Sequence, residues 1–281
     1  APVARALVER YAHRTGHSPI QEIKTYPITP FEHTKRQAQE VYNFGGGNVP
    51  RVITDISRIE KITEKEMKSV GHFYLPELDK WKMNDQGCDF IYSGANPIPF
   101  MLPNGMKEIQ NYSVWKSLGD QLNKFPLFQI HEYQNATEVH QELNFLAIST
   151  KDIDQAISLV GTRKDTVLLL SSSNAHGMPD LRRAFVALLD ANCTAPVVVQ
   201  VSYPAHTADQ TMLYAATDVG GLLVDGLGDG IVISLNPEPT QDRKQVLEQI
   251  KLHNSVSFGV LQAARTRMSK TEYISCPSCG R

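Results

Sequence analysis

The chain has 281 residues, of which 41% are hydrophobic and 21% charged, and its formal net charge is −2 at pH 7, a composition typical of a folded globular protein with one large or two ordinary domains. The near-neutral charge excludes a broad basic field for nucleic acid and a polybasic arm for an anionic membrane. No apolar run reaches the roughly 20 residues that a membrane-spanning helix needs, and the first residues lack the apolar core of a signal peptide, so we expect a soluble intracellular protein.

The first expected element is an amphipathic helix with Val3, Leu7, Val8 and Tyr11 at helical spacing. Eight β-rich runs come after it, and most are continuous apolar stretches, which is typical of strands buried on both faces of a parallel sheet. The expected strands are residues 51–56, 89–93, 127–131, 144–149, 166–171, 197–202, 221–225 and 230–235.

Helical patterns lie between most of these runs. The segment 94–110 is rich in proline and glycine and predicts a long loop, whereas the link GLGDG (226–230) is too short for a helix and predicts a tight turn. The expected helices are residues 63–82 with a break or kink at Pro76, 111–122, 152–160, 179–189, 207–217, 243–252 and a closing helix 256–268.

Strands that alternate with helices argue for right-handed βαβ units and a parallel sheet. Eight strands in one series favour a TIM-like (β/α)8 barrel with one degenerate βα unit, at the 225–230 link. A doubly wound open sheet is the alternative. However, the glycine run 45–47 precedes the first strand, where it cannot cradle a phosphate after a strand, and we interpret it as a flexible loop.

Active sites of such barrels lie at the C-terminal ends of the strands, yet every barrel has polar groups there because its loops face water. Both interpretations stay open for the polar side chains expected at this mouth, which have no diagnostic metal-binding spacing. They are Asp55, Ser93, His131, Glu132, Ser149, Ser172, Asn174, His176, Tyr203, His206, Asp225, Asp229, Asn236 and Glu238.

The loop SSNAHG (172–177) precedes the helix at Pro179. Its hydroxyl and amide groups could bind a phosphate, or they could simply cap the helix. Arg182 and Arg183 lie in the expected first turn of that helix, where positive charge is slightly unfavourable, and we interpret them as a solvated face.

Four cysteines fall into two classes. Cys88 and Cys193 adjoin apolar runs and are expected to be inert core thiols. Cys276 and Cys279 form a Cys-x-x-Cys pair followed by glycine, the spacing of zinc ribbons, iron–sulfur sites and redox disulfides. Because two thiolates are only half of a usual ligand set, an unligated dithiol and a zinc site shared by two chains remain alternatives.

The segment RTRMSKTEYISCPSCGR (265–281) is very similar to the junction that leads into the iron–sulfur domain of 4-hydroxy-3-methylbut-2-enyl diphosphate synthases. GGLLVDGLGDGIVISLNPEP (220–239) resembles the final barrel strands of that family. YAHRTGHSPIQ (11–21) resembles the opening of the extra domain in its long, three-domain form. The resemblance implies that residues 1–268 are the inserted TIM-barrel-like domain and that 269–281 begin the C-terminal iron–sulfur domain.

Family members reduce 2-C-methyl-D-erythritol 2,4-cyclodiphosphate in isoprenoid biosynthesis, with a 4Fe-4S cluster that ferredoxin or flavodoxin supplies with electrons. The resemblance makes Cys276 and Cys279 two of the cluster's ligands; the third cysteine and the glutamate of the family's G-C-x-V-N-G-P-G-E motif do not occur in this sequence. It assigns no catalytic residue here. It implies an inactive spacer between the catalytic barrel and the iron–sulfur domain, in a bacterial cytoplasm or a plant plastid.

The alternative from a different class is a free-standing barrel enzyme or ligand-binding barrel that uses His131, His176 and Asp225 at the mouth.

Overall fold

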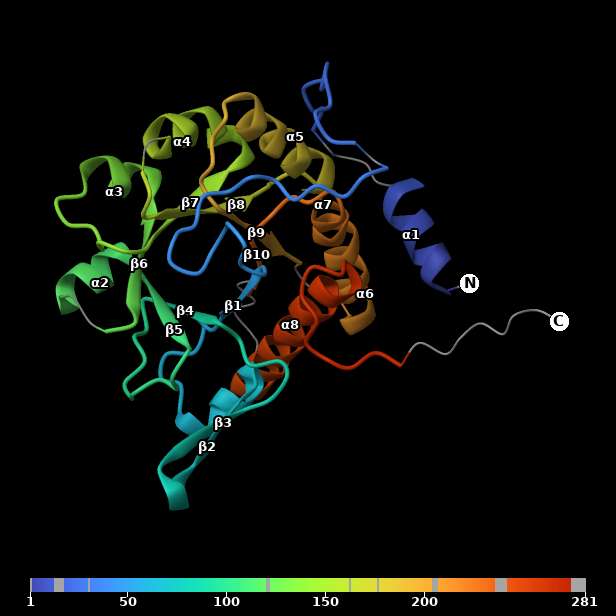
Figure 1. Ribbon diagram of the computed structural model, residues 1–281. Coiled ribbons are helices and arrows are strands. Elements are labelled where there is room, and N and C mark those ends of the chain that lie inside the picture. The colour runs from blue at the N-terminus through green and yellow to red at the C-terminus, as the bar shows by residue number, and fades with distance from the viewer. Residues whose placement is uncertain are drawn as a thin grey trace.

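Eight parallel strands close into a barrel in the computed structural model of the chain, which describes residues 2–12, 18–29, 31–119, 122–161, 163–175, 177–203, 207–235 and 242–273 (Figure 1). Each strand pairs with its sequence neighbours in the series, and β1 pairs with both β4 and β10. The TIM-like α/β fold is therefore confirmed. The barrel strands are β1 (Arg51–Asp55), β4 (Phe90–Gly94), β5 (Lys107–Asn111), β6 (Lys124–Gln129), β7 (Asn144–Ser149), β8 (Thr166–Ser171), β9 (Val197–Ser202) and β10 (Gly230–Ser234).

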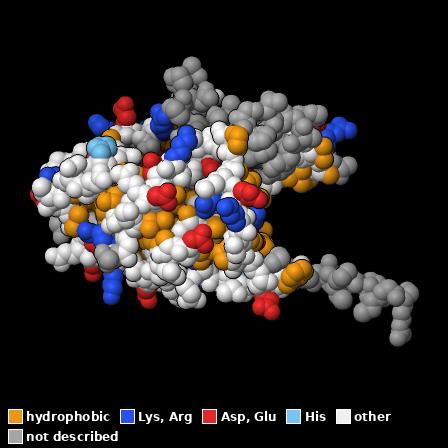
Figure 2. Space-filling view, turned by 90° about the horizontal axis from the view of Figure 1, so that it is seen from above, with side chains coloured by type: hydrophobic (Ala, Val, Ile, Leu, Met, Phe, Trp, Pro, Cys, Tyr) orange, Lys and Arg blue, Asp and Glu red, His pale blue; other side chains and the backbone are white. Residues whose placement is uncertain are grey.

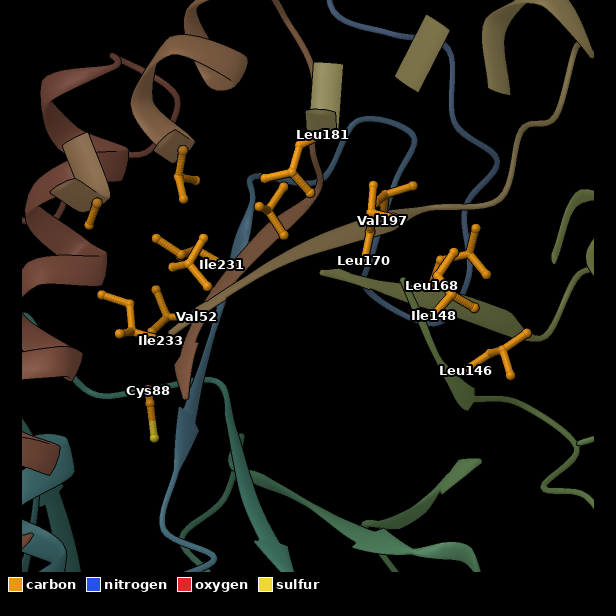
Figure 3. Packing of buried hydrophobic residues seen from close by; sticks show 14 of the residues in the cluster. Val52, Cys88, Leu146, Ile148, Leu168, Leu170, Leu181, Val197, Ile231 and Ile233 are labelled. Carbon is orange, nitrogen blue, oxygen red and sulfur yellow. The ribbon is translucent and has the colours of Figure 1, made fainter. Parts of the chain in front are cut away.

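The apolar runs form strands because both faces of the barrel wall are buried. Side chains alternate along each strand. In β8, Val167 and Leu169 face the barrel interior, while Leu168 and Leu170 pack outward against the helices. Figure 3 shows the outward set, in which Leu168 and Leu170 lie near Ile148 of β7 and Val197 of β9.

Helices cover most of the outer face. The two helices expected at 243–252 and 256–268 are one continuous helix, α8, which packs along β1 and β10. The helical elements are α1 (Pro2–Ala12), η1 (Glu64–Val70), η2 (Pro76–Leu78), α2 (Tyr112–Leu118), α3 (Ile130–Asn135), η3 (Thr150–Asp152), α4 (Ile153–Val160), α5 (Gly177–Asp190), α6 (Ala208–Ala215), η4 (Ala216–Gly220), α7 (Gly221–Val224) and α8 (Arg243–Ala263).

Two predictions about the strand series are wrong. The run 221–225 is no strand, because α6 continues through the π-helical turn η4 into α7 and buries Leu222 and Leu223 against the barrel. The missing strand is β5, which lies where a loop was expected. The β9–β10 connection is thus helical, and the connection that lacks a helix is 95–106, between β4 and β5.

The helix expected over 63–82 is also wrong. Only η1 is helical there, apart from the short turn η2, and β2 (His72–Leu75) and β3 (Lys80–Met83) form an antiparallel hairpin that projects from the barrel (Figure 1). Trp81 stacks on Phe100 of the β4–β5 connection, with ring centroids 6.0 Å apart. The hairpin and that connection therefore take the place of helices over this sector.

Residues 36–50 pass under the N-terminal ends of the strands, here called the lower end, and form an N-terminal plug. Val41 and Phe44 enter the interior core, where Phe44 packs on Phe90 and Phe145. The glycine run 45–47 is a tight turn in this plug rather than a flexible loop. Gly45 has φ +69°, and a Cβ there would meet the carbonyl oxygen of Gln39 at 2.1 Å.

Both described ends of the chain lie in one sector of the barrel (Figure 1). Helix α1 lies against α6, and α6 packs on α8, which leads into the last described residues. Val3 and Val8 of α1 remain 62% and 60% exposed, and hydrophobic side chains are visible on that side of the surface in Figure 2. No helix in the described ranges combines the length and the apolar character needed to cross a bilayer.

Candidate functional site

The C-terminal ends of the strands, here called the upper end or mouth, present polar side chains toward the barrel axis. The Tyr92 hydroxyl donates to Asn111 Oδ1 at 2.7 Å, and Gln200 Nε2 donates to Ser234 Oγ at 2.8 Å. Burial, with Asp55 and Glu132 nearby, raises the pKa of Tyr92 to about 12, so its phenol stays protonated. Two pairs of mouth residues therefore bond each other across adjacent strands.

Asp55 is the buried acid of this layer. Its two carboxylate oxygens accept the backbone N–H groups of Ser57 and Leu235, each at 2.9 Å. Burial raises the pKa of Asp55, and these hydrogen bonds partly oppose that rise. Because Ser57 lies just after β1 and Leu235 just after β10, Asp55 fastens the seam between the first and last strands of the barrel.

Other residues predicted for the mouth have local structural partners. Glu132 accepts from the Gln129 N–H at 2.8 Å and caps α3, whose first turn also contains His131. Ser149 donates to Asp152 Oδ2 at 2.6 Å, and the hydroxyl of Tyr203 donates to Asp218 at 3.1 Å.

For three residues the predicted position at the mouth is wrong. Ser93 points outward and donates to the buried Glu108 at 2.6 Å. Asp225 and Asp229 lie at the lower end, since they precede β10. Asp225 pairs with Arg182 of α5, and Asp229 accepts from the Val197 N–H at 3.0 Å.

The residues His176, His206, Asn236 and Glu238 lie outside the described residues. An arrangement of His131, His176 and Asp225 around one mouth is not supported, because Asp225 is at the opposite end of the barrel.

The loop that begins at Ser172 uses its polar groups within the protein. Ser172 Oγ donates to Asp180 in the first turn of α5 and accepts from the Asn174 N–H at 3.0 Å. Asn174 Nδ2 reaches the Ser18 carbonyl at 2.9 Å. Arg183 binds Gln21 at 3.1 Å. The carboxylate of Asp180 disfavours a phosphate at this helix start, and these contacts favour the capping interpretation.

The electrostatics of the mouth do not suit an anionic substrate. Among the described strand residues, the inward-facing positions of the upper layer have neither lysine nor arginine, and Asp55 is an acid. A diphosphate is ordinarily held by arginine, lysine or a metal ion. Within the described ranges, no three His, Cys, Asp or Glu side chains come together as a metal site.

Of the two predicted classes of cysteine, the structure describes only the buried pair. Cys88 and Cys193 are free and buried, and burial raises the pKa of the Cys88 thiol to about 12, so it is no thiolate ligand at neutral pH. Cys276 and Cys279 lie outside the described residues. The donor chemistry of two thiolates at this spacing fits part of an iron–sulfur ligand set, and the buried Cys88 and Cys193 do not supply the rest.

Comparison with known proteins gives a consistent set of relatives, although no protein-family model matches the chain. A protein named 4-hydroxy-3-methylbut-2-en-1-yl diphosphate synthase (flavodoxin), from Parabacteroides distasonis, is 32% identical over 281 residues, which is 100% of this chain and 41% of the relative. A Bacteroides thetaiotaomicron protein of the same name is 29% identical, with the same shares covered. The chloroplastic ferredoxin-type synthase of Arabidopsis thaliana is 41% identical over 147 residues, 51% of this chain and 17% of the relative.

The chain thus spans about two fifths, or 41%, of the length of curated relatives that match it from end to end. Such full-length similarity at about one-third identity reflects common descent. The chain belongs to the 4-hydroxy-3-methylbut-2-en-1-yl diphosphate synthase family and corresponds to a segment of its longer members.

Proposed function

We propose that this barrel is the inserted domain of a long-form synthase and acts as a spacer. It would set the distance and orientation between a catalytic barrel that precedes it and an iron–sulfur domain that begins at about residue 269. The reaction of the whole protein would be the reductive ring opening of 2-C-methyl-D-erythritol 2,4-cyclodiphosphate, with electrons from flavodoxin or ferredoxin, the donors that the relatives' names give.

The proposal rests mainly on the hydrogen bonding of the polar side chains at the barrel mouth. Several of its described polar groups are bonded to one another or to backbone amides, as Tyr92 is to Asn111, Gln200 is to Ser234 and Asp55 is to two amides. An active site for a cyclic diphosphate needs unengaged donors and cations instead. A barrel with such a mouth is better suited to a structural role than to catalysis.

The placement of the chain ends supports the same role. Because α1 and the segment after α8 lie in one sector, domains attached to the two ends would emerge on the same side of the barrel. They could then face each other within one polypeptide.

Cys276 and Cys279 would supply two thiolate ligands to the 4Fe-4S cluster. When bound, the cluster provides electron transfer to the substrate. The remaining ligands would come from outside this chain, so the chain alone is expected to hold no cluster and to turn over no substrate.

The test uses the longer polypeptide that contains this segment. Replacing residues 18–268 by a flexible Gly/Ser linker is expected to preserve the cluster's absorbance but to lose at least about tenfold in kcat, because the two functional domains lose their relative positioning. Small-angle scattering should show a monomer that becomes more compact with substrate.

The matched control is Tyr92→Phe in the same polypeptide. A spacer predicts unchanged turnover, whereas an active site at the barrel mouth predicts loss of turnover. Full activity after replacement of the barrel, or an active site closed across two chains, would contradict the proposal.

A further inference from the structure

The segment after α8 is folded back onto the barrel by a defined set of contacts. Just beyond the end of α8, Arg265 has φ +59°, and the Thr266 N–H donates to the Leu261 carbonyl at 3.1 Å. This left-handed residue turns the chain sharply, so that residues 266–272 run beside the end of the helix. Such a conformation is uncommon for a residue other than glycine and needs support from its surroundings.

Gln262 provides part of that support, because both ends of its side-chain amide bond to this segment. Its Oε1 accepts from the Ser269 N–H at 3.2 Å, the Ser269 hydroxyl at 3.0 Å and the Lys270 N–H at 3.0 Å. Its Nε2 donates to the Lys270 carbonyl at 3.1 Å and to Glu272 Oε1 at 3.0 Å. Glu272 also pairs with Arg265 at 3.1 Å.

Arg267 attaches the same segment to the lower end of the barrel. Its guanidinium donates to both carboxylate oxygens of Asp89, at 2.5 and 3.1 Å, and to the Pro50 carbonyl at 3.2 Å. It also lies 5.0 Å from the ring centroid of Phe258. The side chains of Arg267 and Asp89 are only 18% and 13% exposed, so this bidentate pair is stronger than a surface ion pair.

Closing the barrel does not require these contacts. The β1–β10 and β1–β4 pairings complete the cylinder, and Asp89 already accepts from the Val52 N–H at 2.8 Å. Ordering a connecting segment of this kind costs about 1–2 kcal/mol per residue. The charged and amide groups that hold this segment therefore indicate that the direction of the chain after the barrel is itself important.

We infer that Gln262 and Arg267 form a clamp that fixes the direction in which the polypeptide leaves the barrel and so positions Cys276 and Cys279 relative to it. The inference rests on the proposed spacer function, since it concerns the domain attached to the end of this barrel. Cys276 is three residues beyond Tyr273, the last described residue, and three residues of chain span at most about 11 Å. Cys276 is therefore held within that reach of the last described residue, and a change in the direction of the exit segment shifts the region that Cys276 can occupy.

Hydrogen exchange on the 281-residue chain measures the clamp directly. Gln262→Ala is expected to speed exchange of the Ser269 and Lys270 amides at least about tenfold, since both lose their acceptor. Exchange at Leu168, whose N–H donates to the Pro196 carbonyl in the barrel wall, should not change. Gln249→Ala is the matched control, because it makes the same change on α8 at a side chain whose Oε1 has no partner in the described chain. Unchanged exchange at Ser269 and Lys270 would overturn the clamp.

The positioning role is tested in the longer polypeptide with Gln262→Ala and Arg267→Lys, which keeps the charge but loses the bidentate geometry. Both variants should retain the cluster absorbance and the KM for the cyclodiphosphate, while kcat falls about tenfold to a hundredfold. An unchanged kcat in a variant whose Ser269 and Lys270 amides exchange faster would overturn the positioning role. Loss of the cluster absorbance would overturn it as well. Either result leaves the linker-replacement test of the spacer function unaffected, so the two proposals fail separately.

Discussion

His253 is a neutral imidazole enclosed between α8 and the barrel wall. It is 3% exposed, and its Nδ1–H donates to the Ile233 carbonyl at 3.2 Å. Burial lowers the pKa of His253 to about 4 from its ordinary 6.5. The unfolded chain therefore binds this proton at a higher pH than the folded chain, and stability is lost as the pH falls through this window.

Because the imidazole of His253 is protonated in the unfolded chain but not in the folded one, we expect the free energy of unfolding to fall by about 3 kcal/mol between pH 6.5 and about pH 4. His253→Gln, which keeps a neutral donor, should lose less stability over that range than the native chain. Urea denaturation at the two ends of the window measures the difference. Equal losses in both proteins would contradict the assignment, because the other titrating groups are common to both.

Arg36 and Asp229 form a buried charge pair beneath the barrel. Arg36 donates to the carbonyls of Cys193 and Ala195 at 2.7 and 2.9 Å and lies 3.8 Å from Asp229. Burial lowers the pKa of Arg36 and raises that of Asp229, because desolvation disfavours both charges. The Val197 N–H and then Arg36 offset part of this desolvation cost for Asp229, and Asp229 offsets part of it for Arg36.

Arg36→Met is expected to cost about 3–5 kcal/mol of unfolding free energy, since it leaves the Asp229 carboxylate buried with only the more distant Lys35. Adding Asp229→Asn should restore part of that loss, because the asparagine still accepts from the Val197 N–H without a charge. Equilibrium unfolding of the two single variants and the double variant gives the coupling. A double variant no more stable than Arg36→Met would contradict the pairing.

The connection between β4 and β5 spans its sector without a helix. Glu108, which is fully buried, accepts from the Ser93 hydroxyl at 2.6 Å and the Ile98 N–H at 2.9 Å. Lys124 of β6 lies 3.2 Å from its other oxygen. One outward-facing carboxylate thus joins this loop to three strands.

Glu108→Ala should lower the free energy of unfolding by about 3 kcal/mol, because it leaves two buried donors and a half-buried ammonium without their acceptor. Glu108→Gln should cost less, since its amide oxygen still accepts from Ser93 and Ile98. Thermal unfolding of both variants checks the order. A larger loss for the glutamine variant would show that charge, rather than hydrogen bonding, fastens the loop.

Seven of the eight barrel strands overlap predicted runs, most of which are continuous apolar stretches, as in Thr166–Ser171. Strand β6 begins three residues before the run predicted at 127–131. Strand β5 has the sequence Lys-Glu-Ile-Gln-Asn, and its Glu108 and Gln110 are buried although they are polar, so no apolar pattern marks it. The run at 221–225 was wrongly predicted because a short apolar stretch does not distinguish a strand from the end of a buried helix. The clamp residue Gln262 has no sequence signal, since its partners are mostly backbone groups brought close by the turn at Arg265.

At the scale of the whole molecule, the closed cylinder ties distant parts of the chain together. Cys88 precedes β4 and Cys193 precedes β9, and both thiols are buried, at 2% and 5% exposure. A closed barrel has no edge strand that can detach locally. We expect both thiols to become accessible only through opening of the whole cylinder.

Thiol labelling in native buffer with detection by mass spectrometry tests this expectation. Cys88 and Cys193 should react with one common rate, which rises with urea in parallel with global unfolding. Cys88→Ala and Cys193→Ala each give a chain in which the other thiol is followed alone. Reaction of one thiol at native conditions while the other stays protected would mean that the barrel opens in parts.

The seam between β1 and β10 also has a consequence for biosynthesis. Arg51 pairs with Gly230, so one edge of β1 cannot pair until a strand about 180 residues further along the chain has been synthesised. At about 5–20 residues per second, translation leaves one side of β1 unpaired for roughly 10–35 s. During that interval the backbone N–H and C=O groups along one edge of β1 have no barrel partner, so the unfinished barrel has an open sheet edge that the complete barrel lacks.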